Sequence, residues 1–334
     1  MKAVMLLSGG LDSALALRLI LQQGVEVHAL NLTSVFCTCT PKGKACSAAC
    51  SAVAGLGVAL TTENTSREFL DVVKRPRHGY GSHMNPCIDC RILMFRRAGE
   101  LMSRIGARFI VTGEVLGERP MSQRGDAMRL IDRESGLSGL VVRPLCAALL
   151  EPTRPERERW VDRNRFLSIR GRSRKPQIAL AKSVGLTDYP CPAGGCLLTD
   201  PEFAARMRDL LAHPPACTLR DVMLLKVGRH FRLSPAVKVV VGRDARENER
   251  IRALAQGTDV LMELKGAPGP LTLVRGPADG ADLAAAARLT AFHSKARCLS
   301  SVTACVATGA GAPLDDLETT LDGAGGLVLL RVAE

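Results

Sequence analysis

The segment Ser8-Gly9-Gly10-Leu11-Asp12-Ser13 combines residue types that could together hold a phosphate group. Glycine lets the backbone approach an anion closely, and the N–H groups at a helix start point towards it with their positive ends. Asp12 adds a carboxylate that could order the loop or hold Mg2+. Asp, Ser and Gly are also common at ordinary helix starts. Because all six positions fit, the segment favours a pyrophosphate site over a simple helix cap.

Cysteine is the second chemically active residue type, with twelve copies in 334 residues. Cys87 and Cys90 form a C-x-x-C pair where a loop meets an expected helix, and such a pair can share a metal or cluster. The helix start and the neighbouring Arg91 are expected to lower a thiol pKa there. A third sulfur has to come from elsewhere in the chain. Cys196, in a Gly-rich loop, is the first choice and Cys191 the second.

A further group of cysteines has a less decisive spacing. Cys37, Cys39, Cys46 and Cys50 lie within fourteen residues and could bind zinc. Cys46 and Cys50 also fit an Ala/Ser-rich helix, where small buried cysteines are common. Both interpretations stay open.

The elements that position these residues alternate in the first half of the chain. Apolar runs predict strands at 2–7, 25–31, 58–62, 108–112 and 140–143, and helical spacing follows at 14–23 and 91–105. The alternation predicts an α/β fold with a doubly wound parallel sheet. Ligands of such sheets bind at the carboxyl ends of the strands. The phosphate segment and the residues after the second and fourth strands are expected to converge there.

Composition divides the chain further. We expect a nucleotide-binding domain at 1–170, a connector with the Gly-rich cysteine loop at 171–215, and a small α+β domain at 216–334. No apolar run approaches the length of a membrane-spanning helix, so we expect a cytoplasmic protein with no membrane partner.

The net charge of +12 suggests a polyanionic partner. Residues 151–182 hold ten Lys or Arg and four Asp or Glu, so this short stretch supplies +6, half of the excess. A solvated helix face or a linker is the plain alternative, but RNA contact is favoured. The expected RNA-binding residues here are Arg170, Arg172, Arg174 and Lys175.

The motifs SGGLDS, NPCIDCR, GRSRKPQIALA and PAGGCLL, in this order, resemble the tRNA thiolation branch of the PP-loop ATP pyrophosphatases, close to tRNA 2-thiouridylases and 4-thiouridine synthases. The resemblance implies an adenine nucleotide alpha hydrolase-like domain. It also implies that ATP and Mg2+ serve to adenylate a uridine carbonyl oxygen of tRNA, which sulfur then replaces. The catalytic residues implied are Cys90, Cys196 and Asp12. The expected ATP-binding residues are Ser8, Gly9, Gly10, Asp12, Ser13, Asn31, Thr112 and Gly113.

Two sulfur-transfer routes fit these positions. In one, Cys196 carries a persulfide that Cys90 resolves, or the reverse. In the other, Cys87, Cys90 and Cys196 hold a 4Fe–4S cluster, and the presence of Cys87 slightly favours this route. Sulfide or a persulfide carrier protein is the expected sulfur donor.

The last third of the chain, around 238–248 and 282–297, resembles the RNA-binding domain of NFACT proteins. That resemblance implies a basic surface for structured RNA, to which Arg229, His230, Arg232, Arg243 and Arg246 would contribute phosphate contacts. The expected function is an ATP-dependent tRNA sulfurtransferase. The alternatives are an adenylating ligase for a small molecule and an RNA-binding protein that only senses a nucleotide.

Overall fold

The computed structural model describes residues 1–38, 47–186, 189, 195–213, 217–321 and 331–332. The chain forms two compact units, Met1–Leu197 and Leu198–Glu334. Within the described part, no helix is both long enough and apolar enough to cross a membrane.

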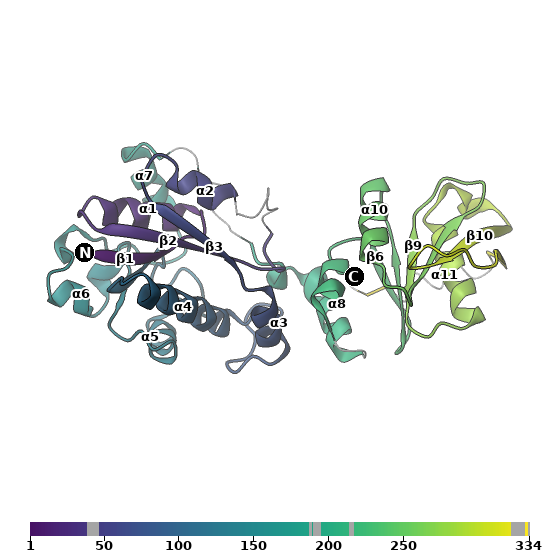
Figure 1. Ribbon diagram of the computed structural model, residues 1–334, viewed down its shortest axis with the longest axis horizontal. Coiled ribbons are helices and arrows are strands. Elements are labelled where there is room, and N and C mark those ends of the chain that lie inside the picture. The colour runs from purple at the N-terminus through teal and green to yellow at the C-terminus, as the bar shows by residue number, and fades with distance from the viewer. Residues whose placement is uncertain (39–46, 187–188, 190–194, 214–216, 322–330, 333–334) are drawn as a thin grey trace. The chain divides into compact units, whose positions relative to one another are not determined.

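A five-stranded sheet forms the centre of the first unit (Figure 1). Its order is β3-β2-β1-β4-β5, and all four pairings are parallel. This confirms the expected α/β class. The strands are β1 (Lys2–Leu6), β2 (Glu26–Thr33), β3 (Ala59–Asn64), β4 (Phe109–Thr112) and β5 (Val141–Val142).

Helices cover both faces of this sheet (Figure 1). Helices α1, α2 and α7 pack on one face, and α4 and α5 pack on the other. The helices are α1 (Leu11–Leu21), α2 (Ser47–Val53), α3 (Ser66–Lys74), α4 (Cys87–Arg104), α5 (Gly125–Glu134), α6 (Arg154–Arg157) and α7 (Lys175–Ser183), with short 3-10 turns η1 (Ala147–Leu149) and η2 (Arg163–Arg165).

Strand β1 explains why both faces need a cover. Ala3 and Met5 pack into the α1 side, whereas Val4 and Leu6 pack into the α4 side. Successive side chains of a strand point to opposite faces, so a strand that is apolar throughout is buried on both.

Helix α4 begins earlier than the expected start at residue 91. Its first hydrogen bond runs from the Cys90 N–H to the Pro86 carbonyl at 2.8 Å, and the helix starts directly after that proline. Cys87 and Cys90 therefore lie in the first turn of α4 rather than in the preceding loop.

The second unit contains a six-stranded antiparallel sheet in the order β11-β10-β8-β9-β7-β6. It confirms the separate α+β domain. Its elements, with η3 (Leu197–Thr199) before them, are α8 (Pro201–Ala212), α9 (Leu219–Leu224), β6 (Arg229–Ser234), β7 (Val237–Val241), α10 (Ala245–Leu254), β8 (Val260–Leu264), β9 (Thr272–Arg275), α11 (Gly280–Phe292), η4 (Lys295–Cys298), β10 (Ser301–Thr308) and β11 (Leu317–Thr320).

The segment 171–215, expected as a connector, is divided between the two units. Helix α7 belongs to the first because Ala181 is buried in the core against α1, while α8 belongs to the second. The apolar face of α7 thus places it in a domain where composition alone suggested a link.

Candidate active site and nucleic-acid interface

The predicted phosphate loop lies between β1 and α1, at the carboxyl edge of the sheet. The Ser13 hydroxyl donates to the Gly10 carbonyl at 2.8 Å, and the Gly10 N–H donates to the Ser8 hydroxyl oxygen at 3.3 Å. Gly10 is the N-cap of α1 and supplies no side-chain cap. The N–H groups of the first turn therefore point towards the open side of the loop, which suits an anion.

Glycine is required at two of the predicted positions. Gly9 has φ of +79°, and a Cβ there would lie 2.4 Å from the Ala48 carbonyl carbon. A Cβ on Gly113 would lie 2.6 Å from the Asp12 carbonyl carbon. The loop therefore packs closely between α2 and the end of β4, and Gly113 touches the loop directly.

Asn31 and Thr112 are brought to the same edge, near the ends of β2 and β4, and both are almost fully buried. The Asn31 amide donates to the Leu7 carbonyl at 2.8 Å, which ties the second strand to the start of the loop. Asn31 and Thr112 therefore lie in the sheet next to the loop.

A charged cluster borders the loop, and the sequence did not predict its composition. The Arg174 guanidinium lies 3.4 Å from an Asp12 oxygen and 2.5 Å from a Glu118 oxygen. Burial raises the pKa of Asp12 against the opposing charge of Arg174. Burial, followed by the charge of Asp12, raises the pKa of Glu118. Arg174, expected as an RNA contact, thus faces the phosphate loop.

Several polar atoms of this cluster are buried without a normal hydrogen bond. They include Asp12 Oδ1, Glu118 Oε2 and Arg174 Nη1, and the Gln177 amide beside Asp12 makes no bond of normal geometry either. Buried polar groups are nearly always paired, so such a group of unpaired atoms indicates a ligand-binding position. Two carboxylates and an arginine beside a helix start fit the charges of ATP with Mg2+.

The C-x-x-C thiols of α4 lie near this edge, but Cys90 is not the activated thiolate expected. The Cys87 sulfur contacts the Ser122 hydroxyl at 3.0 Å, and the Cys90 thiol donates to the Met94 sulfur at 4.0 Å. Although Cys90 keeps some solvent exposure, burial raises the pKa of its thiol to about 12 against the charge of Arg91. The expected lowering is wrong for Cys90, because desolvation outweighs the neighbouring cation.

Glu114 connects these thiols to the phosphate loop. It follows Gly113, which touches Asp12, and its carboxylate lies 3.6 Å from Arg91, the residue after Cys90. A second ion pair to Arg143 at 2.9 Å holds the carboxylate in place. A continuous chain of contacts therefore runs from the loop to the first turn of α4.

Cys196 has a partner that the sequence did not predict. Cys37 and Cys196 pair across an isolated antiparallel β-bridge. The charges of Cys87, Cys196 and Cys37 all act on Cys90, so four thiols gather in this region. Cys37 follows β2 at the carboxyl edge, which was the available signal for its position.

Metal-binding geometry is not formed by these thiols as they stand. Among the residues that the structure describes, no group of three or more His, Cys, Asp or Glu side chains is arranged to hold a metal ion. Of the possible zinc group, Cys39 and Cys46 lie outside the described residues, as does Cys191, and Cys50 is exposed on α2.

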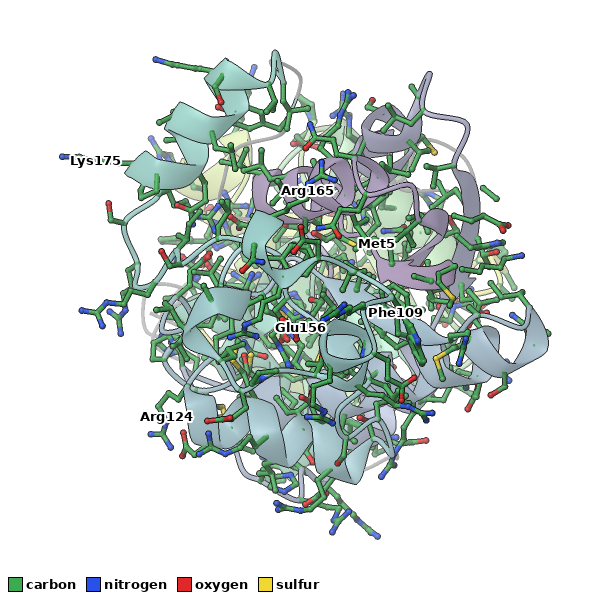
Figure 2. All side chains as sticks on the ribbon, turned by 90° about the vertical axis from the view of Figure 1, so that its left-hand side faces the viewer. Met5, Phe109, Arg124, Glu156, Arg165 and Lys175 are labelled. Carbon is green, nitrogen blue, oxygen red and sulfur yellow. The ribbon has the colours of Figure 1, made fainter. Side chains whose placement is uncertain are left out.

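Arg170, Arg172 and Lys175 remain on the surface around the start of α7. Arg170 is held by a parallel bridge to Leu116, and Lys175 extends away from the domain (Figure 2). These three residues form an accessible basic patch next to the edge that carries the loop.

A second basic group forms in the other unit, where Arg243 is exposed. Burial, followed by the charge of Arg243, lowers the pKa values of Arg206 and Arg229, and Arg331 lowers both further. Clustered arginines create a positive potential, and a positive potential attracts phosphate groups. Sequence inspection missed Arg206 and Arg331, which come from α8 and the far carboxyl-terminal end.

Two other expected RNA contacts are wrong. His230 is fully buried and hydrogen-bonded to the Val227 carbonyl at 2.9 Å, and Arg232 forms a bidentate pair with Asp209 at 2.7 and 2.9 Å. Both side chains leave β6 on the same face, because alternate residues of a strand do so. On that face the carboxylate of Asp209 pairs with Arg232.

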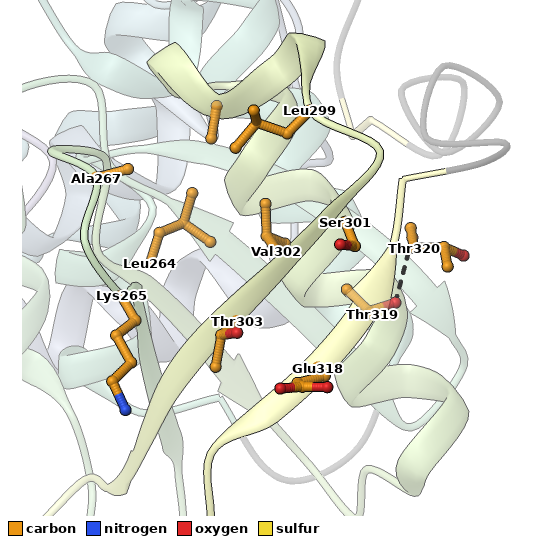
Figure 3. A pocket seen from close by; sticks show the side chains of 11 residues that line it. Leu264, Lys265, Ala267, Leu299, Ser301, Val302, Thr303, Glu318, Thr319 and Thr320 are labelled. Carbon is orange, nitrogen blue, oxygen red and sulfur yellow. Dashed lines mark hydrogen bonds between the residues drawn. The ribbon is translucent and has the colours of Figure 1, made fainter.

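A pocket of about 410 Å3 opens between β8, β10 and β11 (Figure 3). Lys265 and Glu318 are its charged lining residues. It contains none of the residues predicted for the reaction.

Comparison with known proteins gives two family matches. Residues 1–150 match the family model of the thiamine biosynthesis protein (ThiI), and residues 228–317 match that of the NFACT protein RNA binding domain. A probable tRNA sulfurtransferase of Methanosarcina acetivorans is 31% identical over 121 residues, which is 34% of this chain and 28% of that protein. The chain spans less than a third of the length of the curated relatives it matches.

Two solved structures are similar to parts of the chain. One is a 4-thiouridine synthetase–RNA complex with bound ATP, at 26% identity and a TM-score of 0.34, covering 43% of this chain and 36% of that one. The other is the U34-tRNA thiolase NcsA from Methanococcus maripaludis with its 4Fe–4S cluster, at 16% identity and a TM-score of 0.34, covering 63% and 66%.

Proposed function

We propose that the chain is an ATP-dependent tRNA sulfurtransferase, because residues 1–150 match the ThiI family model and residues 228–317 match that of the NFACT RNA-binding domain. It adenylates a uridine carbonyl oxygen and replaces that oxygen with sulfur. The observation that carries the proposal is the chain of contacts from the phosphate loop through Gly113 and Glu114 to Arg91, which neighbours the four gathered thiols. A nucleotide site and a sulfur site at one sheet edge suit a reaction that needs both.

In the first half-reaction, the first-turn N–H groups of α1 and the hydroxyls of Ser8 and Ser13 hold the phosphates of ATP. Asp12 and Glu118 are the residues that would hold Mg2+, which would supply positive charge against the pyrophosphate. Arg174, which lies beside both carboxylates, donates to phosphate oxygens of ATP. The buried atoms that lack partners in this cluster support this assignment.

In the second half-reaction, sulfur attacks the adenylated carbon and AMP departs with the former carbonyl oxygen. Cys196 and Cys90 are the proposed catalytic cysteines. The thiol of Cys90, with its pKa raised to about 12 by burial, stays protonated at neutral pH. We therefore assign the sulfur carrier to Cys196.

A 4Fe–4S cluster held by Cys87, Cys90 and Cys196 stays a prediction. The described thiols would have to turn towards one another before they could hold it, since their present arrangement offers no metal site. The residues do not fit a cluster as they stand, so the proposed steps use the thiols alone.

The RNA substrate contacts two basic surfaces in this proposal. Arg170, Arg172 and Lys175 lie beside the reaction edge, while Arg229, Arg243 and Arg331 bind phosphates through the second unit. These contacts carry no base specificity. The proposed sulfur donor is a persulfide carrier protein, whose outer sulfur passes to the Cys196 thiol without an added oxidant. A cytoplasmic location remains an expectation.

The deciding experiment gives anaerobically prepared protein ATP, Mg2+, polysulfide as the persulfide-forming sulfur source and bulk unmodified tRNA, and measures AMP and thionucleoside together. Wild-type protein should form AMP only when RNA is present, together with a new thiouridine. Cys196→Ala should abolish thiouridine formation. Cys298 is exposed in the second unit, so Cys298→Ala is the control and should leave thiouridine formation intact. AMP formation that ignores RNA would favour the small-molecule ligase. RNA binding without any AMP would favour the nucleotide-sensing protein.

A further inference from the structure

The β-bridge between Cys37 and Cys196 has a specific register. The Leu197 N–H donates to the Phe36 carbonyl at 2.9 Å, and the Thr38 N–H donates to the Gly195 carbonyl at 3.3 Å. These two bonds enclose Cys37 and Cys196 without joining them to each other. The two cysteines are therefore a non-hydrogen-bonded antiparallel pair, the closer of the two kinds, with Cα atoms about 4.5 Å apart in general.

That register suits a disulfide. Disulfide-bonded cysteines have Cα separations of about 4.4–6.8 Å, and their side chains must leave the backbone on the same side. Directly opposite residues of an antiparallel pair satisfy the second condition by construction. Both residues are partly exposed, so reagents and substrate can reach them.

Both sides of the bridge are held in place. Phe36 is fully buried and packs edge-to-face on Phe69 at 5.4 Å. The Thr38 hydroxyl donates to the Gly195 carbonyl at 2.9 Å, and a Cβ on Gly195 would press on Thr38 at 3.0 Å. The close approach therefore uses a glycine, and the backbone itself sets the separation of the two cysteines.

The other nearby thiols are directed elsewhere. The Cys87 sulfur is bonded to Ser122, and the Cys90 thiol is directed along its own helix to Met94. The Cys37 sulfur is held by the Ser34 N–H at 3.3 Å and lies 3.5 Å from the Ser34 hydroxyl. Of the four thiols, Cys37 alone has a backbone-defined position opposite Cys196.

We propose that Cys37 is the thiol partner of Cys196, that the two form a reversible disulfide across the bridge, and that Cys37 rather than Cys90 releases the sulfur carried by Cys196. The release rests on the proposed function. The disulfide does not.

The step balances without an added oxidant. The terminal sulfur of a Cys196 persulfide bonds to the activated uridine carbon as AMP leaves, so that RNA is joined to Cys196 through an S–S bond. The Cys37 thiolate then attacks Cys196 Sγ. The bond to the RNA sulfur breaks with its electron pair on that sulfur, which gives the thiouridine and a Cys37–Cys196 disulfide. An external dithiol reduces the disulfide for the next turnover.

The disulfide is tested first, on the full chain and without RNA. Reduced protein is treated with oxidised glutathione, alkylated and digested without reduction. Because the tryptic peptides 19–42 and 183–206 each contain a second cysteine, fragmentation must locate the link. A link between Cys37 and Cys196 in wild type and Cys298→Ser, lost in Cys37→Ser, is expected. Absence of that link, or a link of Cys196 to Cys90, overturns the proposal whether or not the protein thiolates tRNA.

The release is tested by a single turnover with persulfidated protein. Wild type should yield thiouridine together with the disulfide. Cys37→Ser should keep RNA covalently attached, with at least tenfold less released product, and dithiothreitol should restore the release. A structural defect would not leave such an adduct. If Cys37→Ser releases thiouridine as wild type does, Cys37 has no part in sulfur release.

Discussion

Arg174 offers the sharpest test of how the basic segment is divided between ATP and RNA. The sequence groups it with Arg170, Arg172 and Lys175, whereas the structure directs it to Asp12 and Glu118. We predict that Arg174→Gln weakens ATP binding and leaves RNA binding unchanged. Arg172→Gln, an exposed neighbour on the same segment, is the matched control and should do the reverse.

The magnitude follows from the geometry. An attraction across 3.4 Å between Arg174 and Asp12 amounts to about 5 kcal/mol at an effective dielectric constant of about 20. The side chains are 22% and 18% exposed, and desolvation offsets much of the attraction, so about 2 kcal/mol of stability is expected to be lost. A lost charged hydrogen bond to phosphate weakens ATP binding by about 1.5–3 kcal/mol, roughly 10- to 100-fold.

The assay measures the dissociation constants of ATP with Mg2+ and of tRNA over a range of salt concentrations, beside urea unfolding. Arg172→Gln should lower the slope of log affinity against log salt by about 1, because one phosphate contact is removed. Arg174→Gln should leave that slope unchanged. A loss of RNA affinity and salt slope in Arg174→Gln, with ATP binding intact, would refute the reasoning.

Three further outcomes are expected. In metal-free protein at pH 8, iodoacetamide should modify exposed Cys50 much faster than Cys90. Burial raises the pKa of Cys90 to about 12, so that about one Cys90 thiol in ten thousand is ionised. Equal modification rates of the two cysteines, followed by mass spectrometry, would contradict this. For Asp209, the hydrogen bond from Arg232 and the charge of Lys238 outweigh burial and lower the pKa to about 2, below the unfolded value of 3.8. About 2 kcal/mol of stability present above pH 4 should therefore be lost as the pH falls to 2. Urea unfolding of Asp209→Asn should lack this part of the pH dependence. Gly9→Ala should abolish ATP binding, because its Cβ would lie 2.4 Å from backbone and the residue has a φ of +79°. Gly24→Ala, with a similar φ of +72° and open space around it, is the control and should bind ATP normally in isothermal titration. Normal ATP binding by Gly9→Ala would show that the loop can move.

The comparison of sequence with structure separates local from tertiary information. Periodicity predicted all five strands of the first unit, because a parallel sheet covered on both faces favours continuous apolar runs such as residues 3–6 of β1. The placement of residues 8–13 between a strand and a helix, and of the C-x-x-C pair at a helix start, was likewise readable, since each depends on residue types at fixed local spacing. Strand order also follows general rules, which is why Asn31 and Thr112 could be assigned to one edge.

The pKa of a thiol and the partner of a charged side chain could not be predicted from the sequence in the same way. The charge of Arg91 beside Cys90 suggested a lowered pKa, but the actual shift depends on how much protein surrounds the thiol. Arg174 and Arg172 are two residues apart and look alike in the sequence. Only the placement of α7 against α1 decides that one of them faces Asp12.

The sequence by itself determined the local chemistry of this protein: which residues could bind phosphate, which sulfurs could react, and which segments are strands or helices. The tertiary structure alone decided which distant residues meet. Cys37 and Cys196 are 159 positions apart, and no local pattern links them. Their pairing depends on where the end of β2 and the Gly195 segment come together, which is fixed by packing over the whole unit.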